Sequence, residues 1–367
     1  MTEQRVRQIL VEGFTSIRSA SVELGQLNVL VGANGAGKSN FIRAFEMLGR
    51  IADEELGYFV GKNGGAAVLL NEGSDRGQIR VRLTATSITY EAVLEPAGED
   101  YLVLLHEALS TKDSVVALGH GGRETGMRRD ARHREISAHA DVVELLRGCR
   151  VFHFHDAGAS APPKRMTSTA DNLMLRQDAG NLAAVLLALR DDQQNGYAAA
   201  YDQIVNAIQL VAPFFWDFVL EPNQEERVLL RWRQQGSDEV FSAGQMSDGT
   251  LRFVCLATLL LHPRLPALVV LDEPELGLHP FAIVQLADLL RAASTRSQVL
   301  IATQSVTLMN QFTVDDLIVV ERGEGASRFH RPDPEALRIW LDEYSLGEIW
   351  EMNLIGGRPT NEGSARG

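Results

Sequence analysis

The feature that most constrains how this 367-residue chain folds is one octapeptide: Gly32-Ala33-Asn34-Gly35-Ala36-Gly37-Lys38-Ser39. It fits the pattern G-x-x-x-x-G-K-[ST], in which glycines let the backbone wrap phosphates and point its N–H groups at them. An apolar strand is expected before it, at Leu27–Val31, and an amphipathic helix after it, at Ser39–Leu48. A strand, a glycine-rich loop and a helix in this order indicate an α/β fold.

This P-loop predicts an ATP site made of residues 32–40, with Asn40 as its last member. The N-terminus of the helix adds a positive end that favours an anion. Lys38 is expected to reach the β- and γ-phosphates and to assist catalysis, and the Ser39 hydroxyl is expected to ligate Mg²⁺. The alternative is a glycine-rich turn that matches the pattern by chance.

A second candidate lies where an expected buried strand, Leu268–Leu271, ends in Asp272 and Glu273. Ligands bind at the carboxyl ends of the strands in an α/β sheet. Asp272 is therefore predicted to hold Mg²⁺, directly or through water, and Glu273 to activate the attacking water as general base. The alternative is a strand that happens to meet an acidic turn.

A third candidate is the segment Met246–Thr250, which immediately precedes an expected helix at Leu251–Leu261. Ser247 is suited to cap that helix, and Gly249 leaves the helix start open to an anion, so both are predicted to contact ATP. Asp248 would repel a phosphate. We therefore expect its carboxylate to point away or to interact with the helix dipole. An ordinary capped helix is the alternative.

The fourth candidate is Gln304, within Thr303-Gln304-Ser305 after an expected strand at Val299–Ala302. A glutamine amide can hydrogen-bond a γ-phosphate or the attacking water, so Gln304 is predicted to be catalytic. The side chain has no proton to exchange near neutral pH. A polar loop after a strand is the alternative.

This ordered set of motifs resembles the stand-alone predicted ATPases of the ABC class, near the RecF, SMC and overcoming-lysogenization-defect groups (AAA family ATPases of the AAA_21 type). The resemblance covers nearly the whole chain. It depends most on three segments: Val11–Ile17, Glu273–Pro280 and Ala302–Ser305. The signature motif of the class is usually Leu-Ser-Gly-Gly-Gln, and in this chain Asp248 replaces the first glycine and Thr250 replaces the glutamine. The class usually has a histidine at the position of Gln304.

The resemblance implies a P-loop NTPase fold, an ABC-type ATPase head with an antiparallel β subdomain and a helical lobe, with ATP and Mg²⁺ as cofactors. It also implies an ATP-driven head-to-tail homodimer, in which Ser247 and Gly249 of one subunit close on the P-loop site of the other. We expect one head over residues 1–355. Its parts are an N-terminal lobe with the P-loop and a β meander (1–155), a helical and signature lobe (156–250), the Walker B and switch part (251–330), a C-terminal helical piece (331–355) and then a flexible tail (356–367).

The formal net charge of −13 argues against a generic nucleic-acid binder, so a DNA contact would need a local basic patch. The one basic cluster is formed by Arg123, Arg128, Arg129, Arg132 and Arg134. It could grip nucleic-acid phosphates, or it could be a solvated loop, because acidic residues are interspersed. Two histidines in an expected strand at Val151–Phe154 and beyond, His153 and His155, could hold a metal, border the junction between lobes, or be structural.

A cytoplasmic location is expected from two observations. The cysteines, Cys149 and Cys255, both lie in apolar sequence and are interpreted as reduced core residues. The first residues are charged where a signal peptide would be apolar, and the best candidate for a membrane span, Val254–Leu261, is too short to cross a bilayer. We therefore expect no membrane association.

The leading functional hypothesis is an ATPase whose ATP cycle closes and opens a homodimer, in DNA repair or maintenance or in anti-phage defence. The chain has no heptad array and little sequence after the switch region, so a nuclease or effector would be a separate protein. A second hypothesis is a slow, nucleotide-gated scaffold that regulates a partner effector. A third is the nucleotide-binding subunit of a transporter.

Overall fold

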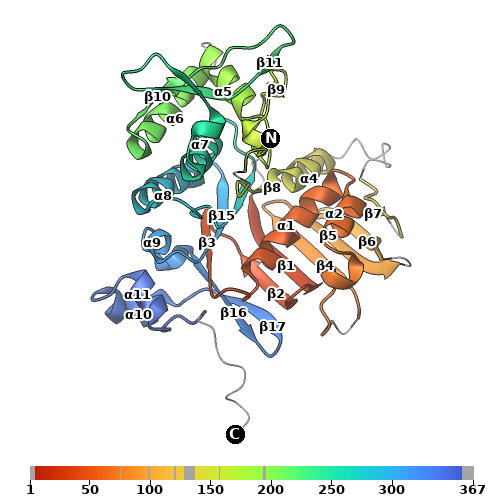
Figure 1. The fold of residues 1–367 in the computed structure, drawn as a ribbon. Coiled ribbons are helices and arrows are strands. Elements are labelled where there is room, and N and C mark those ends of the chain that lie inside the picture. The colour runs from red at the N-terminus through yellow and green to blue at the C-terminus, as the bar shows by residue number, and fades with distance from the viewer. Residues whose placement is uncertain are drawn as a thin grey trace. The chain divides into compact units, whose positions relative to one another are not determined.

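The computed structural model describes residues 5–74, 76–97, 100–119, 121–127, 137–156, 158–192 and 196–357 (Figure 1). The chain forms two compact units. The first contains Met1–Val151, Pro266–Val270 and Gln298–Gly367, and the second contains Phe152–Leu265 and Leu271–Ser297. The lobe boundaries expected at 155, 250 and 330 stay predictions.

The strands are β1 (Val6–Phe14), β2 (Ile17–Glu23), β3 (Leu27–Val31), β4 (Ile79–Ala85), β5 (Ile88–Ala97), β6 (Tyr101–Thr111), β7 (Val115–Gly119), β8 (Cys149–Phe152), β9 (Thr167–Ser168), β10 (Phe215–Phe218), β11 (Arg227–Val228), β12 (Arg231–Gln234), β13 (Val240–Ser242), β14 (Leu268–Asp272), β15 (Gln298–Thr303), β16 (Leu317–Gly323) and β17 (Ala326–His330). The helices are α1 (Lys38–Ala52), α2 (Leu56–Lys62), α3 (Ala66–Leu69), α4 (Ser137–Gly148), α5 (Leu182–Asp191), α6 (Tyr197–Val211), α7 (Asp248–Leu261), α8 (Pro280–Ser294), α9 (Val306–Met309), α10 (Pro334–Leu341) and α11 (Leu346–Glu351), with 3₁₀ turns η2 (Pro162–Lys164), η3 (Ala243–Gln245) and η4 (Val314–Asp316).

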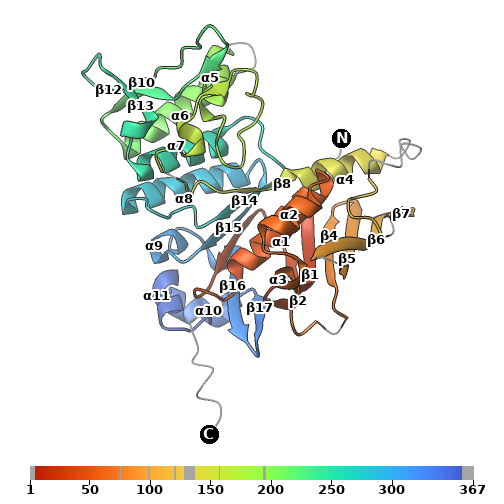
Figure 2. The same cartoon turned by 45° about the vertical axis from the view of Figure 1, so that its right-hand side comes forward.

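An antiparallel sheet with the order β2-β1-β4-β5-β6-β7 builds one side of the first unit. Its strands alternate, as in β4, where Ile79, Val81 and Leu83 are buried and the residues between them are half-buried. Figure 2 shows α1 running along this sheet, and the apolar side of α1 belongs to the same core. The predicted β meander is therefore confirmed, with longer strands than the sequence indicated.

A mixed sheet with the order β17-β16-β3-β15-β14-β8 carries the P-loop. Strand β3 lies between β15 and β16 and runs parallel to both, and all five of its residues are buried. A strand covered on both faces has to be continuously apolar, which explains the unbroken sequence of Leu27–Val31. The chain passes between the two units within β8 and within β14.

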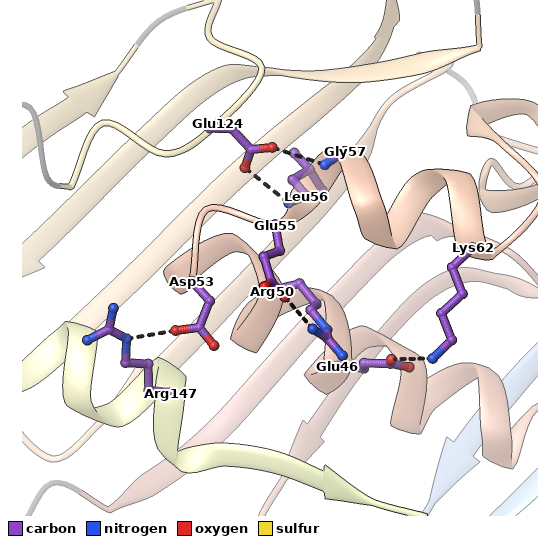
Figure 3. Close-up of polar contacts among 9 residues, drawn as sticks. All are labelled: Glu46, Arg50, Asp53, Glu55, Leu56, Gly57, Lys62, Glu124 and Arg147. Atoms are coloured by element: carbon purple, nitrogen blue, oxygen red, sulfur yellow. Dashed lines mark hydrogen bonds and ion pairs between the residues drawn. The ribbon is translucent and has the colours of Figure 1, made fainter. Parts of the chain in front are cut away.

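Ion pairs and a cap hold the helices of the first unit (Figure 3). Glu124 accepts hydrogen bonds from the backbone N–H groups of Leu56 and Gly57, at 3.0 and 3.1 Å, and so caps α2 from a distant loop. Arg147 on α4 donates to Asp53 at 2.9 Å, just beyond the end of α1. Two further pairs in the same region are Arg50–Glu55 and Lys62–Glu46. These contacts fix the end of α1 that lies away from the P-loop.

Helices α5, α6, α7 and α8 form most of the second unit, beside a small sheet with the order β10-β12-β13. The residue pattern of Phe215–Leu220 and Arg227–Trp232 predicts two strands that pair with each other, and the structure agrees only in part. Phe218 does pair with Trp232, but the segment Arg227–Val228 pairs with β9 instead. Alternating sequence identifies a strand but not its partner, which depends on residues far away in the chain.

The C-terminal helical piece expected over residues 331–355 consists of two helices, α10 and α11. Ser345 caps α11, since its hydroxyl accepts from the backbone N–H of Glu348 while the Glu348 carboxylate accepts from Ser345. This capping box starts a new helix and so interrupts the periodic pattern. Within the described ranges, no helix is both long and apolar enough to cross a membrane.

Candidate nucleotide-binding site

Three glycines shape the loop between β3 and α1. A Cβ on Gly32 would lie 2.2 Å from the carbonyl oxygen of Val320, and one on Gly37 would lie 2.0 Å from Oγ of Ser327. Gly37 has φ +117° and Gly35 has φ +75°, and nothing lies within 4 Å of a Cβ on Gly35. Only glycine tolerates these close approaches and this backbone. The loop is therefore a backbone cradle at a helix N-terminus, the arrangement that binds phosphate.

Lys38 is the first residue of α1 and is only 5% exposed. Its ammonium donates hydrogen bonds to the carbonyl oxygens of Gly32, at 2.7 Å, and Ala33, at 3.0 Å. These acceptors are neutral, and an anionic phosphate oxygen makes a stronger hydrogen bond with an ammonium. The next residue, Ser39, is exposed.

A chain of hydrogen bonds connects the P-loop to β17 and to the turn between β1 and β2. Asn40 donates to Oγ of Ser16 at 2.8 Å, and the two hydroxyls of Ser16 and Ser327 lie 2.7 Å apart. Ser327 in turn donates to the carbonyl oxygen of Ala36 at 2.6 Å. The structure thus joins two predicted site residues, Asn40 and Ala36, through side chains from β17 and from the turn between β1 and β2. No motif in the sequence marked Ser327.

The predicted switch residue lies at the same sheet edge as the P-loop. Thr303 pairs with Val31 in the parallel ladder of β15 and β3, so Gln304 and Gly32 follow at the carboxyl ends of neighbouring strands. The backbone N–H of Ser305 donates to Oγ1 of Thr303 at 3.0 Å. The Ser305 hydroxyl in turn caps α9. The half-buried Gln304 therefore lies between two residues whose side chains both hydrogen-bond the backbone.

In the second unit, Asp272 ends β14 and Glu273 follows it, both half-buried. Glu273 has φ +45°, an uncommon conformation for a residue with a Cβ. Its carbonyl oxygen accepts from the N–H of Leu276 at 3.1 Å and so closes a turn. Strained residues of this kind concentrate at functional sites, and the role of Glu273 as general base stays a prediction.

The predicted helix cap in the signature segment is present. Ser247 accepts from the backbone N–H of Thr250 at 3.1 Å, and their hydroxyls lie 2.7 Å apart. Asp248 occupies the first position of α7, and its carboxylate lies 3.8 Å from the ammonium of Lys164, whose side chain is 8% exposed. The carboxylate therefore faces both a helix N-terminus and a lysine, as the sequence required of an acid at this position.

Gly249 packs against Gly277, and Gly277 also lies close to Arg252, a residue that no sequence motif indicated. A Cβ on Gly249 would lie 2.6 Å from the carbonyl oxygen of Gly277. The buried guanidinium of Arg252 donates to the carbonyl oxygens of Phe154, at 2.9 Å, and His155, at 3.2 Å, and abuts Gly277. Burial lowers the pKa of Arg252. One side chain thus ties together α7, the loop before α8 and the segment after β8.

Two weaker candidates have different outcomes. The strand expected over Val151–Phe154 ends at Phe152, so His153 and His155 lie beyond it, exposed and with their rings 6.2 Å apart. No cluster of three or more potential metal ligands occurs among the residues that the structure describes. In the basic cluster, Arg123 lies 4.6 Å over the ring of Tyr101. The other members lie outside the described residues: Arg128, Arg129, Arg132 and Arg134.

The residues present fit ATP and Mg²⁺. The loop leaves no room for a Cβ at Gly32 or Gly37, so its backbone can come close to a phosphate chain, and Lys38 supplies a cation. Ser39, exposed in the first unit, and Asp272, half-buried in the second, each carry oxygen atoms of the kind that Mg²⁺ prefers as ligands.

Comparison with known proteins agrees with this geometry. A family model described as "AAA domain, putative AbiEii toxin, Type IV TA system" matches residues 27–310. A structure of an Smc head bound to the C-winged helix domain of ScpA superposes with a TM-score of 0.55 at 16% identity, covering 91% of this chain and 99% of that one. Smc head domains from Pyrococcus furiosus and Pyrococcus yayanosii both give TM-scores of 0.54, at 15% and 12% identity, covering 93% of this chain and 99% of each of theirs. No curated protein sequence is significantly similar. The expected α/β fold, that of an ABC-type ATPase head, is confirmed.

Proposed function

The chain belongs to this AAA domain family, and from that premise we propose that it binds ATP with Mg²⁺ and hydrolyses it. The observation that carries the proposal is the glycine cradle at the end of β3, with the buried ammonium of Lys38 inside it. A phosphate chain is the ligand that such a loop recognises. The fold, shared with SMC heads, supplies the expected framework.

In the proposed reaction, water attacks the γ-phosphate in line with the leaving group. Lys38 and the loop N–H groups stabilise negative charge on the phosphates, and Glu273 orients the water and accepts its proton. Gln304 hydrogen-bonds the γ-phosphate or the water. Mg²⁺, held by Ser39 and Asp272, would neutralise charge on the phosphate oxygens.

We further propose that ATP closes a head-to-tail homodimer, with Ser247 and Gly249 of one copy facing the P-loop of the other. The pairing of Asp248 with Lys164 supports this idea, since it offsets a negative charge that would otherwise repel the nucleotide. Gly249, packed against Gly277, keeps the start of α7 free of a side chain.

Two variants test the site. Lys38→Ala should abolish tight binding of ATP, measured by titration with a fluorescent analogue, and unchanged affinity would remove the P-loop assignment. Glu273→Gln should still bind ATP but accumulate as a dimer, measured by light scattering after chromatography. If Glu273→Gln hydrolyses ATP at the parent rate, the general base lies elsewhere.

We propose that the ATP cycle serves a separate partner protein, either an effector or a nuclease, in defence or DNA maintenance. The family description refers to a toxin of a toxin–antitoxin system, which favours defence. ATPase rates measured with and without DNA, at a stated salt concentration, distinguish a role in DNA maintenance from a role in defence. If no form of DNA stimulates the ATPase rate, a role in DNA repair is excluded.

A second candidate function is a slow, nucleotide-gated scaffold. The presence of Gln304, which cannot exchange a proton near neutral pH, favours it. Single-turnover kinetics distinguish the two, because fast repeated turnover without a partner excludes the scaffold.

A further inference from the structure

The C-terminal segment of the described chain ends on the P-loop. The carbonyl oxygen of Gly357 accepts a hydrogen bond from the backbone N–H of Ala33 at 2.7 Å. That N–H belongs to the same peptide unit as the carbonyl of Gly32, which accepts from Lys38 at 2.7 Å. In a trans peptide these two groups point in opposite directions. The peptide unit between Gly32 and Ala33 is therefore hydrogen-bonded to Gly357 through its N–H and to Lys38 through its carbonyl oxygen.

Gly357 is itself held in place. Its N–H donates to a carboxylate oxygen of Glu321 on β16 at 2.8 Å. Gly356 and Gly357 have φ +79° and +82°, and a Cβ on Gly356 would lie 2.1 Å from that carboxylate. A Cβ on Gly357 would lie 3.1 Å from Nε1 of Trp350 and 3.3 Å from Cα of Gly32. Two successive left-handed residues in this space have to be glycines.

The other end of the segment contacts the helix that follows the switch. The N–H of Gly347 on α11 donates to Oδ1 of Asn310 at 2.6 Å, and a Cβ on Gly347 would lie 2.3 Å from a methyl carbon of Val306. Val306 begins α9, two residues after Gln304. Residues 346–357 thus link the turn after β15 to the loop after β3.

We propose that Gly357, anchored by Glu321, is a positioning residue for Lys38, and that residues 346–357 thereby set the affinity for ATP. This rests on the proposed ATP site. When the hydrogen bond from Ala33 is lost, the peptide between Gly32 and Ala33 rotates and its carbonyl no longer directs the ammonium.

The test uses the full chain and measures binding of N-methylanthraniloyl-ATP with Mg²⁺, together with the thermal unfolding midpoint. Glu321→Ala should weaken binding about fivefold, the value of one ordinary hydrogen bond. Glu321→Gln should restore the affinity, because an amide oxygen still accepts from Gly357. Glu335→Ala, which removes an exposed carboxylate of the same C-terminal region, is the matched control and should leave the affinity unchanged. Equal affinities for Glu321→Ala and the parent overturn the proposal, and so does a Glu321→Gln variant as weak as Glu321→Ala.

A truncation pair decides the matter if Glu321→Ala fails to fold. A chain that ends after Gly357 keeps the contact, and one that ends after Ile355 loses it. The first should bind as the parent does and the second about fivefold more weakly. Equal binding by both refutes the positioning role. Lys38→Ala separates this failure from that of the proposed function, since parent-like binding by Lys38→Ala would remove the ATP site itself.

Discussion

Replacing Ser327 by alanine should loosen the P-loop by a calculable amount. Ser327 is 2% exposed and makes two hydrogen bonds with its hydroxyl, one to the carbonyl oxygen of Ala36 and one with the hydroxyl of Ser16. Each hydrogen bond contributes about 1 kcal/mol net. In the alanine variant, the carbonyl oxygen of Ala36 and the hydroxyl of Ser16 would stay buried or half-buried without this hydrogen-bond partner. The free energy of unfolding of the first unit should therefore fall by about 2 kcal/mol. In a unit of this size, that corresponds to a midpoint lower by about 4–8 °C.

The assay is differential scanning calorimetry of the full chain, with fluorescent ATP titration on the same samples. Ser19→Ala is the control, because Ser19 also lies beside the turn after β1 but makes only an exposed bond, to Glu12 at 3.3 Å. Its midpoint should match the parent. A Ser327→Ala midpoint within about 1 °C of the parent, against the shift expected from two hydrogen bonds, would show that the network does not support the loop.

Three further predictions concern the cores of the two units. Glu107→Ala should lower the free energy of unfolding by about 3 kcal/mol or more in urea titration, because fully buried Glu107 accepts from the Tyr90 hydroxyl and two other donors that would lose their acceptor. Burial lowers the pKa of His262 below its ordinary 6.5, so the unfolded chain binds more protons there. Stability should hold above pH 6.5 and fall as the pH drops below it, and His262→Gln should flatten that part of a pH series of urea midpoints. Burial raises the pKa of Cys149 and Cys255 to about 12, so a thiol reagent at neutral pH should label both only in denaturant, and rapid native labelling would contradict their burial.

Local patterns in the sequence predicted several of the elements that carry the candidate site. Strand β3 has the predicted bounds and the Ser247 cap is present, because apolar periodicity, glycine spacing and capping are properties of adjacent residues. The P-loop, Gln304 and the acidic end of β14 were found for the same reason. Asp248 was expected to point away from the phosphates or to interact with a helix dipole, and it occupies the first position of α7. Its lysine partner lies 84 residues earlier, and no pattern indicated it.

By itself, the sequence determined that a phosphate-binding loop joins a buried strand to a helix, and which side chains follow the neighbouring strands. Tertiary structure alone decided what holds that loop. Ser327 and Gly357 reach it across about 290 and 320 residues of chain, and Arg252 joins segments of the second unit that are almost 100 residues apart. Such contacts arise only when sheets pair and helices pack, so they follow from the register of whole strands and leave no periodic signal in the residues that make them.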